Sequence, residues 1–175
     1  MLNKMKKILM VTERGIIKCI NYVNMPLYMA LYRRWLKKAG VNFSGGATEY
    51  IDPSCDFDGA GYHLITIGEN TTISKEVLIL VHDYSINRGL AMHQVNGKYQ
   101  FLKPVKIGEN CFIGARSTLL PGTKIGSNCI IGACSVVKGT IPDNSVVCGN
   151  PAQIMCSTNE WTKKHINKAD YVEAK

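Results

Sequence analysis

The chain has 175 residues, of which 46% are hydrophobic and 19% charged, and its 21 Lys and Arg exceed its 13 Asp and Glu for a net charge of +8. This length suits one domain with its own core, and the ordinary hydrophobic fraction excludes a disordered chain, a collagen-like chain and a small disulfide scaffold. The excess of positive charge by itself fits nucleic acid, anionic lipid and a phosphorylated cofactor equally well.

The first residues predict neither a secretory signal nor a membrane span. Lysines precede a short apolar stretch, Ile8–Val11, which Glu13 and Arg14 then interrupt. The uncharged stretch Cys19–Tyr32 is shorter than the roughly 20 apolar residues that a bilayer requires. The seven cysteines are an odd count without paired spacing, which favours reduced thiols. We therefore expect a cytoplasmic protein.

A helix is predicted over residues 24–40, where Asn24 can cap the start and Gly40 can end it. Three apolar residues recur on one face of this helix: Leu27, Leu31 and Trp35. We assign residues 1–44 to a basic helical segment, because they carry nine Lys or Arg against one acid. Such a segment can cap the end of a domain, pack against another subunit or, through residues 24–40, contact a membrane surface.

Between Val105 and Pro142 the sequence repeats every six residues. The first position of each repeat is aliphatic: Ile107, Ile113, Leu119, Ile125, Ile131 and Val137. The second is mostly glycine: Gly108, Gly114, Gly126 and Gly132. The fifth is small: Cys111, Ser117, Thr123, Cys129 and Ser135. A period of six is neither the helical 3.6 nor the strand period of two, and it is typical of a parallel β-helix.

The columns have a physical reason in that geometry. With three faces to a coil, residues 18 apart stack, so we expect Ile107 to lie beneath Ile125 and Ile113 beneath Ile131. The small residues fit the narrow interior near each corner, and glycine admits backbone angles that a Cβ would resist. The rival interpretation is a sandwich of ordinary strands, and six consecutive repeats in register argue against it. The prediction is an all-β solenoid over residues 45–152.

The same register continues upstream at Ile51, Ile67, Ile73 and Ile79, with an irregular step over residues 57–63. The pattern then stops over residues 85–104. A solenoid can extrude a loop without losing its core, and long loops in compact domains are usually functional or disordered. The loop begins just after His82, which makes this histidine a candidate functional residue.

Residues 153–175 form a predicted C-terminal tail with a short helix. Ser157 to Glu160 read as a capping box in front of Trp161 and Ile166. As for the N-terminal helix, the simplest role is to cap the open end of the solenoid or to pack between subunits.

Together, the repeats, the Val81-His82-Asp83-Tyr84 segment and the closing Ile141–Ala152 segment resemble the hexapeptide-repeat acyltransferases with a left-handed β-helix. The chain is most similar to the sugar and polysaccharide O-acetyltransferase branch, which includes galactoside and maltose acetyltransferases. The resemblance covers Ala47 to Met155. It implies a homotrimer with clefts between subunits, and direct transfer of an acetyl group from acetyl-CoA to a hydroxyl of a sugar or surface-polysaccharide precursor.

The resemblance also assigns site residues. It makes His82 the general base, and an imidazole suits that role because its ordinary pKa lies near 6.5. It makes the backbone N–H of Ala115 the donor that stabilises the oxyanion. Contacts with coenzyme A are expected at Gly114, Ala115, Ala133 and Lys138.

Other polar residues have less support. Asp58 and Asp83 could orient His82 or bind a sugar hydroxyl, but solvated surface carboxylates are the simpler interpretation of both. Cys111 and Cys129 are interpreted as stacked core thiols rather than nucleophiles. Gln153 stands where relatives often carry a basic residue for the nucleotide phosphates, so Lys138 or a neighbouring subunit has to supply that charge, or coenzyme A binds with less of it.

Two other functions are compatible with the same fold. One is a non-catalytic β-helix scaffold. The other is a carbonic-anhydrase-like metalloenzyme, which needs three histidines on zinc, and the regular repeats contain none, so we expect no metal. Nucleic acid is not expected as a partner because no motif combines aromatic and basic residues. Residues 45–152 hold eight basic and nine acidic residues, so the positive excess lies almost entirely in residues 1–44.

Overall fold

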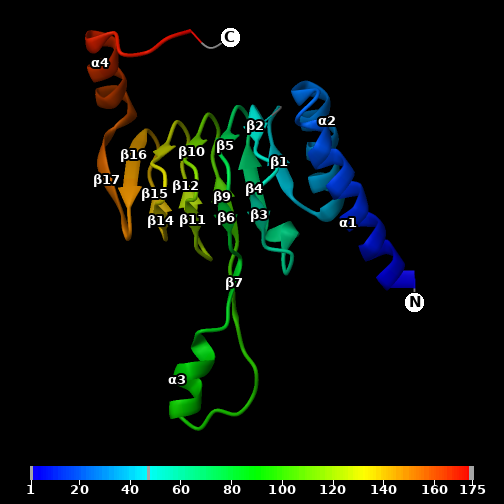
Figure 1. Cartoon of the computed structure of the whole chain (residues 1–175). Helices are drawn as coiled ribbons and strands as arrows, with labels where there is room; N and C mark the ends of the chain where they lie inside the picture. Colours follow the sequence, from blue (N-terminus) through cyan, green and yellow to red (C-terminus); the bar gives the residue numbers. More distant parts are fainter. Residues whose placement is uncertain (1, 47, 174–175) are drawn as a thin grey trace.

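The structure is a computed structural model that describes residues 2–46 and 48–173 (Figure 1). Residue 47, where the family resemblance begins, lies outside the described residues. The helical elements are α1 (Leu2–Ile20), α2 (Met25–Ala39), η1 (Tyr62–Leu64), α3 (Ile86–Met92) and α4 (Thr158–Lys168). The strands are β1 (Asn42–Ser44), β2 (Tyr50–Ile51), β3 (Asp56–Phe57), β4 (Ile65–Gly68), β5 (Thr72–Ile73), β6 (Leu78–Ile79), β7 (His82–Asp83), β8 (Phe101–Leu102), β9 (Val105–Ile107), β10 (Phe112–Ile113), β11 (Thr118–Leu119), β12 (Lys124–Ile125), β13 (Ile130–Ile131), β14 (Val136–Val137), β15 (Thr140–Ile141), β16 (Ser145–Gly149) and β17 (Ala152–Ser157).

Parallel strands form the three sides of a triangular prism. Side A contains β1, β4, β9, β12 and β15, side B contains β2, β5, β10, β13 and β16, and side C contains β3, β6, β11 and β14. Ile107 pairs with Ile125 and Ile113 with Ile131, which confirms the predicted stacking of residues 18 apart. The all-β solenoid is therefore confirmed. We name the corners by the sides they join: edge AB, edge BC and edge CA.

The two interior columns of the repeat fill the prism. The aliphatic residues of the first position are all buried, and so are the small residues of the fifth. The small polar side chains bond to carbonyl oxygens of the following coil: Ser117 Oγ donates to Gly132 at 3.0 Å, and Cys111 Sγ donates to Gly126 at 3.0 Å. These bonds satisfy polar groups that water cannot reach. The interpretation of Cys111 as a core thiol agrees with its burial.

The repeat glycines are required for a reason other than the expected one. Gly108 does not have a positive φ, but a Cβ there would lie 2.5 Å from the carbonyl carbon of Gly126 in the next coil. The left-handed conformation occurs instead at the fourth position of the repeat, where Asn110 has φ 52° and Asn128 has φ 57°. Close approach between coils, rather than backbone freedom, therefore explains the glycine at the second position.

Helix α2 covers the first coil of the prism. Its predicted ends are confirmed, because the Asn24 side chain accepts from the N–H of Leu27 and Gly40 ends the helix at φ 118°. The expected apolar face is partly wrong: Leu27 is exposed, and the helix buries a different set, Tyr28, Met29, Tyr32, Trp35 and Leu36. The hydroxyl of Tyr28 donates to the carbonyl of Ile51 at 2.7 Å, which ties the helix to β2.

Helix α1 lies in the segment of residues 1–44 assigned as helical, within which only residues 24–40 were given as a defined helix. It packs on α2, where the indole N–H of Trp35 donates to the carbonyl of Met10 at 3.0 Å. Figure 1 shows both helices at one end of the prism. None of the helices in the described part of the chain combines the length and apolar character that a bilayer span requires.

The extruded loop leaves the prism after side C and contains structure of its own. Strands β7 and β8 pair in antiparallel fashion at its base, and α3 lies near its tip, well away from the prism (Figure 1). At the far end of the prism, β17 turns back antiparallel on β16. The predicted capping box is confirmed: Ser157 Oγ accepts from the N–H of Glu160, whose carboxylate accepts from the N–H of Ser157.

Candidate active site

His82 begins β7 at edge CA, where the loop leaves the prism. Its Nδ1 is hydrogen-bonded to the carboxylate Oδ2 of Asp58, which lies one coil earlier. The same carboxylate oxygen accepts the backbone N–H of Val81 at 3.0 Å and of His82 at 3.1 Å. Asp58 therefore holds both the imidazole ring and the backbone from which the ring projects.

Asp58 is ionised despite its burial. Its exposed fraction is 8%, and burial alone would raise its pKa. Hydrogen bonds from the backbone of Val81 and Ala60 and from His82 outweigh this effect and bring the pKa of Asp58 below its ordinary value. The interpretation of Asp58 as a solvated surface carboxylate is therefore wrong. Because an ionised carboxylate only accepts hydrogen bonds, Nδ1 of His82 donates to it, and in the neutral imidazole the lone pair is then on Nε2.

The loop supports the imidazole from its other side. The ring of Tyr84 meets the His82 ring edge-on, with centroids 5.3 Å apart. Asn87 fixes the turn that follows, because its amide donates to the carbonyl of Tyr84 at 2.9 Å and its Oδ1 accepts the N–H of Tyr99 at 2.8 Å. The side chain of His82 remains 28% exposed. The imidazole of His82 is therefore held in one orientation and is still accessible to a substrate.

A small cavity of about 170 Å³ opens beside β7 on edge CA. Its lining comes from the loop and the two following coils: Asp83, Ser85, Phe101, Lys103, Leu120, Pro121 and Lys138. The hydrogen bond from the backbone of Ser85, 2.7 Å long, is the main reason that the pKa of Asp83 is lowered. Lys138 therefore lies on the edge of His82, away from Gly114 and Ala133 of the same chain.

The other expected cofactor residues lie together on edge BC. Gly114 and Ala133 are in close contact across coils, since a Cβ on Gly114 would lie 2.5 Å from the nitrogen of Ala133. Ala115 follows Gly114 at the same corner, and its carbonyl accepts the N–H of Cys134 at 2.8 Å. Edge BC and edge CA are different corners of the prism. One chain therefore does not bring His82 and Ala115 together.

The N–H of Ala115 is available as a donor. Its neighbours Gly114 and Arg116 donate their N–H groups to Ile131 and Lys75 in adjacent coils. Within the described ranges, 2–46 and 48–173, the N–H of Ala115 donates no hydrogen bond. A free backbone N–H beside a glycine can donate to a ligand oxygen.

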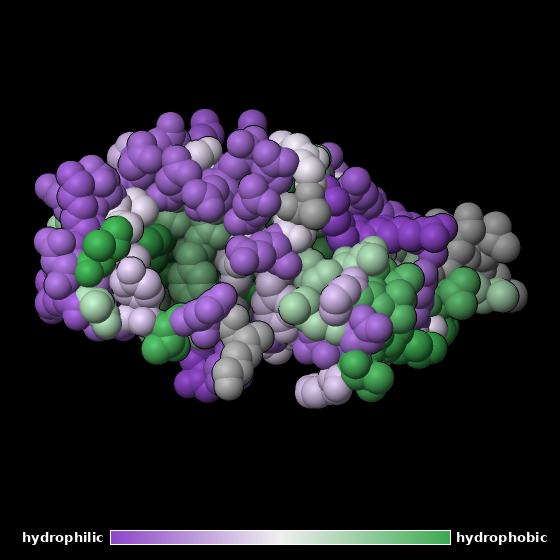
Figure 2. Space-filling model, turned by 90° about the horizontal axis from the view of Figure 1, so that it is seen from above, coloured by the Kyte–Doolittle hydropathy of each residue, from purple (hydrophilic) through white to green (hydrophobic). Residues whose placement is uncertain are grey.

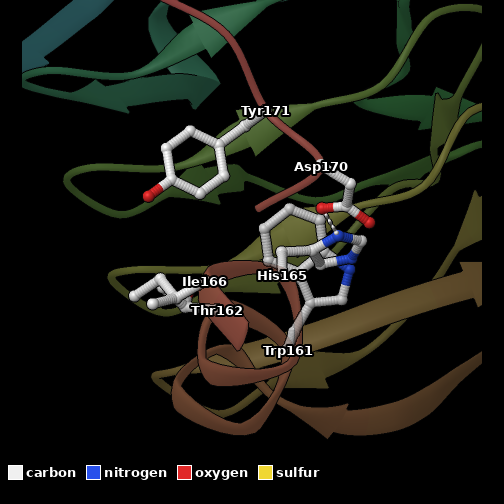
Figure 3. Close-up of a pocket in the computed structure, with 6 residues that line it drawn as sticks. All are labelled: Trp161, Thr162, His165, Ile166, Asp170 and Tyr171. Carbon is white, nitrogen blue, oxygen red and sulfur yellow. Dashed lines mark hydrogen bonds and ion pairs between the residues drawn. The ribbon is translucent and has the colours of Figure 1, made fainter. Parts of the chain in front are cut away.

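A larger pocket of about 550 Å³ lies on α4 (Figure 3). It is lined by Trp161, Thr162, His165, Ile166, Asp170 and Tyr171. His165 Nδ1 is 2.8 Å from a carboxylate oxygen of Asp170, and the two rings of Trp161 and His165 lie side by side. Because α4 begins beside Asn144 on edge AB, this pocket is remote from His82. Among the residues with described positions, no three His, Cys, Asp or Glu side chains gather as a metal site would require.

Comparison with known proteins identifies related sequences. Residues 104–139 match the family model described as bacterial transferase hexapeptide (six repeats). The chain is 33% identical to Protein CapG of Staphylococcus aureus over 84% of this chain and 86% of that protein. It is 36% identical to the putative lipopolysaccharide biosynthesis O-acetyl transferase WbbJ of Escherichia coli (strain K12) over 59% of this chain and 56% of WbbJ. Galactoside O-acetyltransferase of the same strain is 34% identical over 64% of this chain and 53% of that protein, so the chain spans about half the length of these two relatives.

Solved structures share the fold. A galactoside acetyltransferase in complex with coenzyme A superposes with a TM-score of 0.57 and 23% identity, over 92% of this chain and 86% of that chain. A maltose O-acetyltransferase from Clostridium difficile 630 superposes with a TM-score of 0.53 and 24% identity, over 85% and 88%. The predicted left-handed hand of the β-helix is thereby confirmed.

Proposed function

The chain belongs to the bacterial hexapeptide-repeat transferases, and we propose that it transfers the acetyl group of acetyl-CoA to a hydroxyl of a sugar or of a surface-polysaccharide precursor. The observation that carries this proposal is the accessible imidazole of His82, which the buried carboxylate of Asp58 holds by Nδ1. Two relatives, the putative lipopolysaccharide biosynthesis O-acetyl transferase WbbJ and galactoside O-acetyltransferase, support an O-acetyl transfer to a sugar.

The chemistry requires a base because a sugar hydroxyl is a poor nucleophile near neutral pH. His82 accepts the hydroxyl proton on Nε2 as the hydroxyl oxygen attacks the thioester carbon of acetyl-CoA. A new carbon–oxygen bond forms, the carbon–sulfur bond breaks, and the sulfur leaves with a proton returned from the imidazolium. The negative charge of Asp58 stabilises that imidazolium while it exists.

The backbone N–H of Ala115 is the proposed donor to the oxyanion that forms during this attack. Its lack of a partner in the described part of the chain supports the assignment, since a preorganised donor costs no rearrangement at the moment of reaction. Gly114 and Ala133 let the cofactor approach the backbone of edge BC. Lys138 approaches the same substrates from edge CA.

We propose that the active unit is a homotrimer with its active sites between neighbouring chains. The separation of His82 and Ala115 onto different edges supports this, because a cleft between edge CA of one chain and edge BC of the next contains both groups. The acceptor sugar then binds between the chains, close to the extruded loop.

A non-catalytic scaffold is the rival proposal, and the geometry of His82 favours an enzyme. Stacking of coils is complete without an ionised carboxylate beneath the surface, and burial of such a group is unfavourable. A pair that holds an imidazole with one nitrogen free serves proton transfer better than it serves stability.

The test is a thiol-release assay with His82→Ala. We expect loss of acceptor-dependent release of coenzyme A by at least a hundredfold, because general base catalysis commonly contributes about 10²–10⁴-fold. His165→Ala is the matched control, since His165 is another histidine paired with an aspartate but lies on α4. Turnover by His82→Ala at the rate of the control would remove His82 from the mechanism.

A further inference from the structure

Helix α1 has an apolar face that no other described part of the chain covers. Met5, Ile8 and Leu9 are each 64% exposed, and Ile16 is 68% exposed. Residues spaced by three, four and eleven lie on one side of a helix, so these side chains form one stripe along α1. We call it the outer stripe. Tyr22 and Val23, in the turn after the helix, extend the exposed apolar surface.

The opposite face of α1 is already used in packing. Ile17 is buried against α2, and the carbonyl of Met10 accepts the indole N–H of Trp35. Helix α2 in turn packs most of its apolar residues on the prism, where Tyr28, Tyr32 and Leu36 are fully or almost fully buried, although Met25 and Leu27 at its start are exposed. The outer stripe is therefore additional to what folding requires. It is also exposed, so it is available to a partner.

The segment that carries the outer stripe is basic. Residues 1–44 carry nine Lys or Arg and a single acid, Glu13. The carboxylate of Glu13 is paired with Lys38 of α2 at 2.9 Å, so the only acid of the segment is already neutralised. Figure 2 shows a hydrophobic area over the N-terminal end of the molecule, bordered by hydrophilic side chains.

We propose that α1 binds the surface of an anionic membrane, with the outer stripe in the boundary between headgroups and acyl chains. An apolar stripe on a helix rich in lysine is suited to that boundary, and each basic side chain near it gains attraction to anionic headgroups. This moves the expected membrane contact from residues 24–40 to α1, because most of the apolar side chains of α2 are buried.

A second copy of the chain is a less suitable occupant. A two-fold contact through the outer stripe would place each basic segment against its own copy. With nine positive charges and one neutralised acid on each side, such a contact is opposed by repulsion. An anionic lipid surface covers the same apolar side chains and attracts the same charges.

The location of α1 suggests what membrane binding would do for the enzyme, and this step alone rests on the proposed function. Strands β1, β2 and β3 form the first coil beside α2, and β4, β5 and β6 form the second, which ends at His82. Because coils are spaced by about 5 Å, the proposed base lies within two coils of the helical cap. A sugar carried on a lipid would therefore be presented to the end of the prism that holds His82.

The test is sedimentation of the full chain with vesicles of phosphatidylcholine alone or mixed with phosphatidylglycerol. We expect binding only to the mixed vesicles, and its loss at high salt. Ile8→Ser combined with Leu9→Ser should weaken this binding roughly tenfold or more, because it removes half of the outer stripe. Ile166→Ser is the matched control, since Ile166 is 56% exposed on α4 at the other end of the chain, and it should bind as the unaltered chain does.

Two results would overturn the inference. One is a sedimentation result: the unaltered chain binds both kinds of vesicle equally, or the double variant binds the mixed vesicles as well as the unaltered chain does. The other is a larger particle for the unaltered chain than for the double variant by light scattering without vesicles, which would make the outer stripe a contact between copies. Thiol release with a soluble sugar should be the same for the double variant and the unaltered chain, so failure of membrane binding and failure of the proposed function are told apart.

Discussion

At the scale of single residues, the carboxylate of Asp58 links the fold to the proposed chemistry. It is buried, it accepts hydrogen bonds from the backbone of Ala60 in its own coil and of Val81 in the next, and it also holds the ring of His82. Sequence reasoning named Asp58 as a candidate but favoured a solvated position. A carboxylate 24 positions before the histidine carries no local signal of contact, because only the coil geometry brings the two together.

Asp58→Asn should lower kcat while leaving the fold intact. The amide is nearly isosteric, but it is neutral and can donate to Nδ1, which would put the ring in the wrong tautomer and leave Nε2 without its lone pair. We expect a loss of roughly a hundredfold or more in thiol release. Asp56→Asn is the control, because Asp56 lies two residues earlier, on β3, and is exposed. Equal rates for the two variants would show that Asp58 has no part in orienting the base.

Asp58 should also contribute to stability in a pH-dependent way. Its pKa is lowered in the folded chain, so its contribution is present above the unfolded value of about 3.9 and is lost as pH falls through the folded value. Thermal unfolding measured from pH 6 down to acid should therefore show the unaltered chain losing its advantage over Asp58→Asn below about pH 4. A constant difference between the two chains across this range would contradict the prediction.

At the scale of elements, the six-residue repeat fixes which side chains face inward, but the role of each column depends on the neighbouring coil. The aliphatic and small columns could be assigned from periodicity, and both are buried. The positions of the repeat glycines were predicted correctly, but the reason given for them, backbone freedom, was wrong. A contact between Gly108 and Gly126 is invisible in local sequence because it depends on how closely two coils stack.

Two glycine substitutions separate these causes. Gly108→Ala should destabilise the chain by about 1–3 kcal/mol, because its Cβ overlaps backbone that cannot move aside. Gly15→Ala, in the exposed interior of α1, should stabilise it by about 0.5–1 kcal/mol, because no atom lies within 4 Å of the new Cβ and alanine favours helix. Thermal or denaturant unfolding measures both, and a tolerated Gly108→Ala would contradict the stacking explanation.

At the scale of the whole molecule, the candidate site is divided between two corners of the prism. His82 and Lys138 lie on edge CA, and Ala115 and Ala133 lie on edge BC. The family resemblance predicted all four residues, but it did not predict that they lie on two different edges of one chain. Position within a six-residue repeat determines the corner, and the corner determines which residues a single chain can bring together.

Mixed trimers test whether the site lies between chains. His82→Ala removes the base, and Ala133→Trp places a bulky ring on exposed edge BC, where it should block acetyl-CoA. Each variant alone should be inactive, whereas random mixing in a symmetric trimer leaves about one quarter of the clefts with both halves intact. Thiol release by refolded mixtures near that fraction supports the shared cleft. Mixtures as inactive as the separate variants would place the site within one chain.

The sequence by itself determined the solenoid, its register, the loop and the helix caps, because each of these depends on residues close together in the chain or on a strict period. The repeated aliphatic and small residues can be buried together only in coils that stack every 18 residues. The tertiary structure decided what depends on contacts between distant coils: the burial and ionisation of Asp58, the division of the site between two edges, and the second apolar face of α1. Those contacts arise from how closely the coils and the helical cap pack, and no local pattern records that distance.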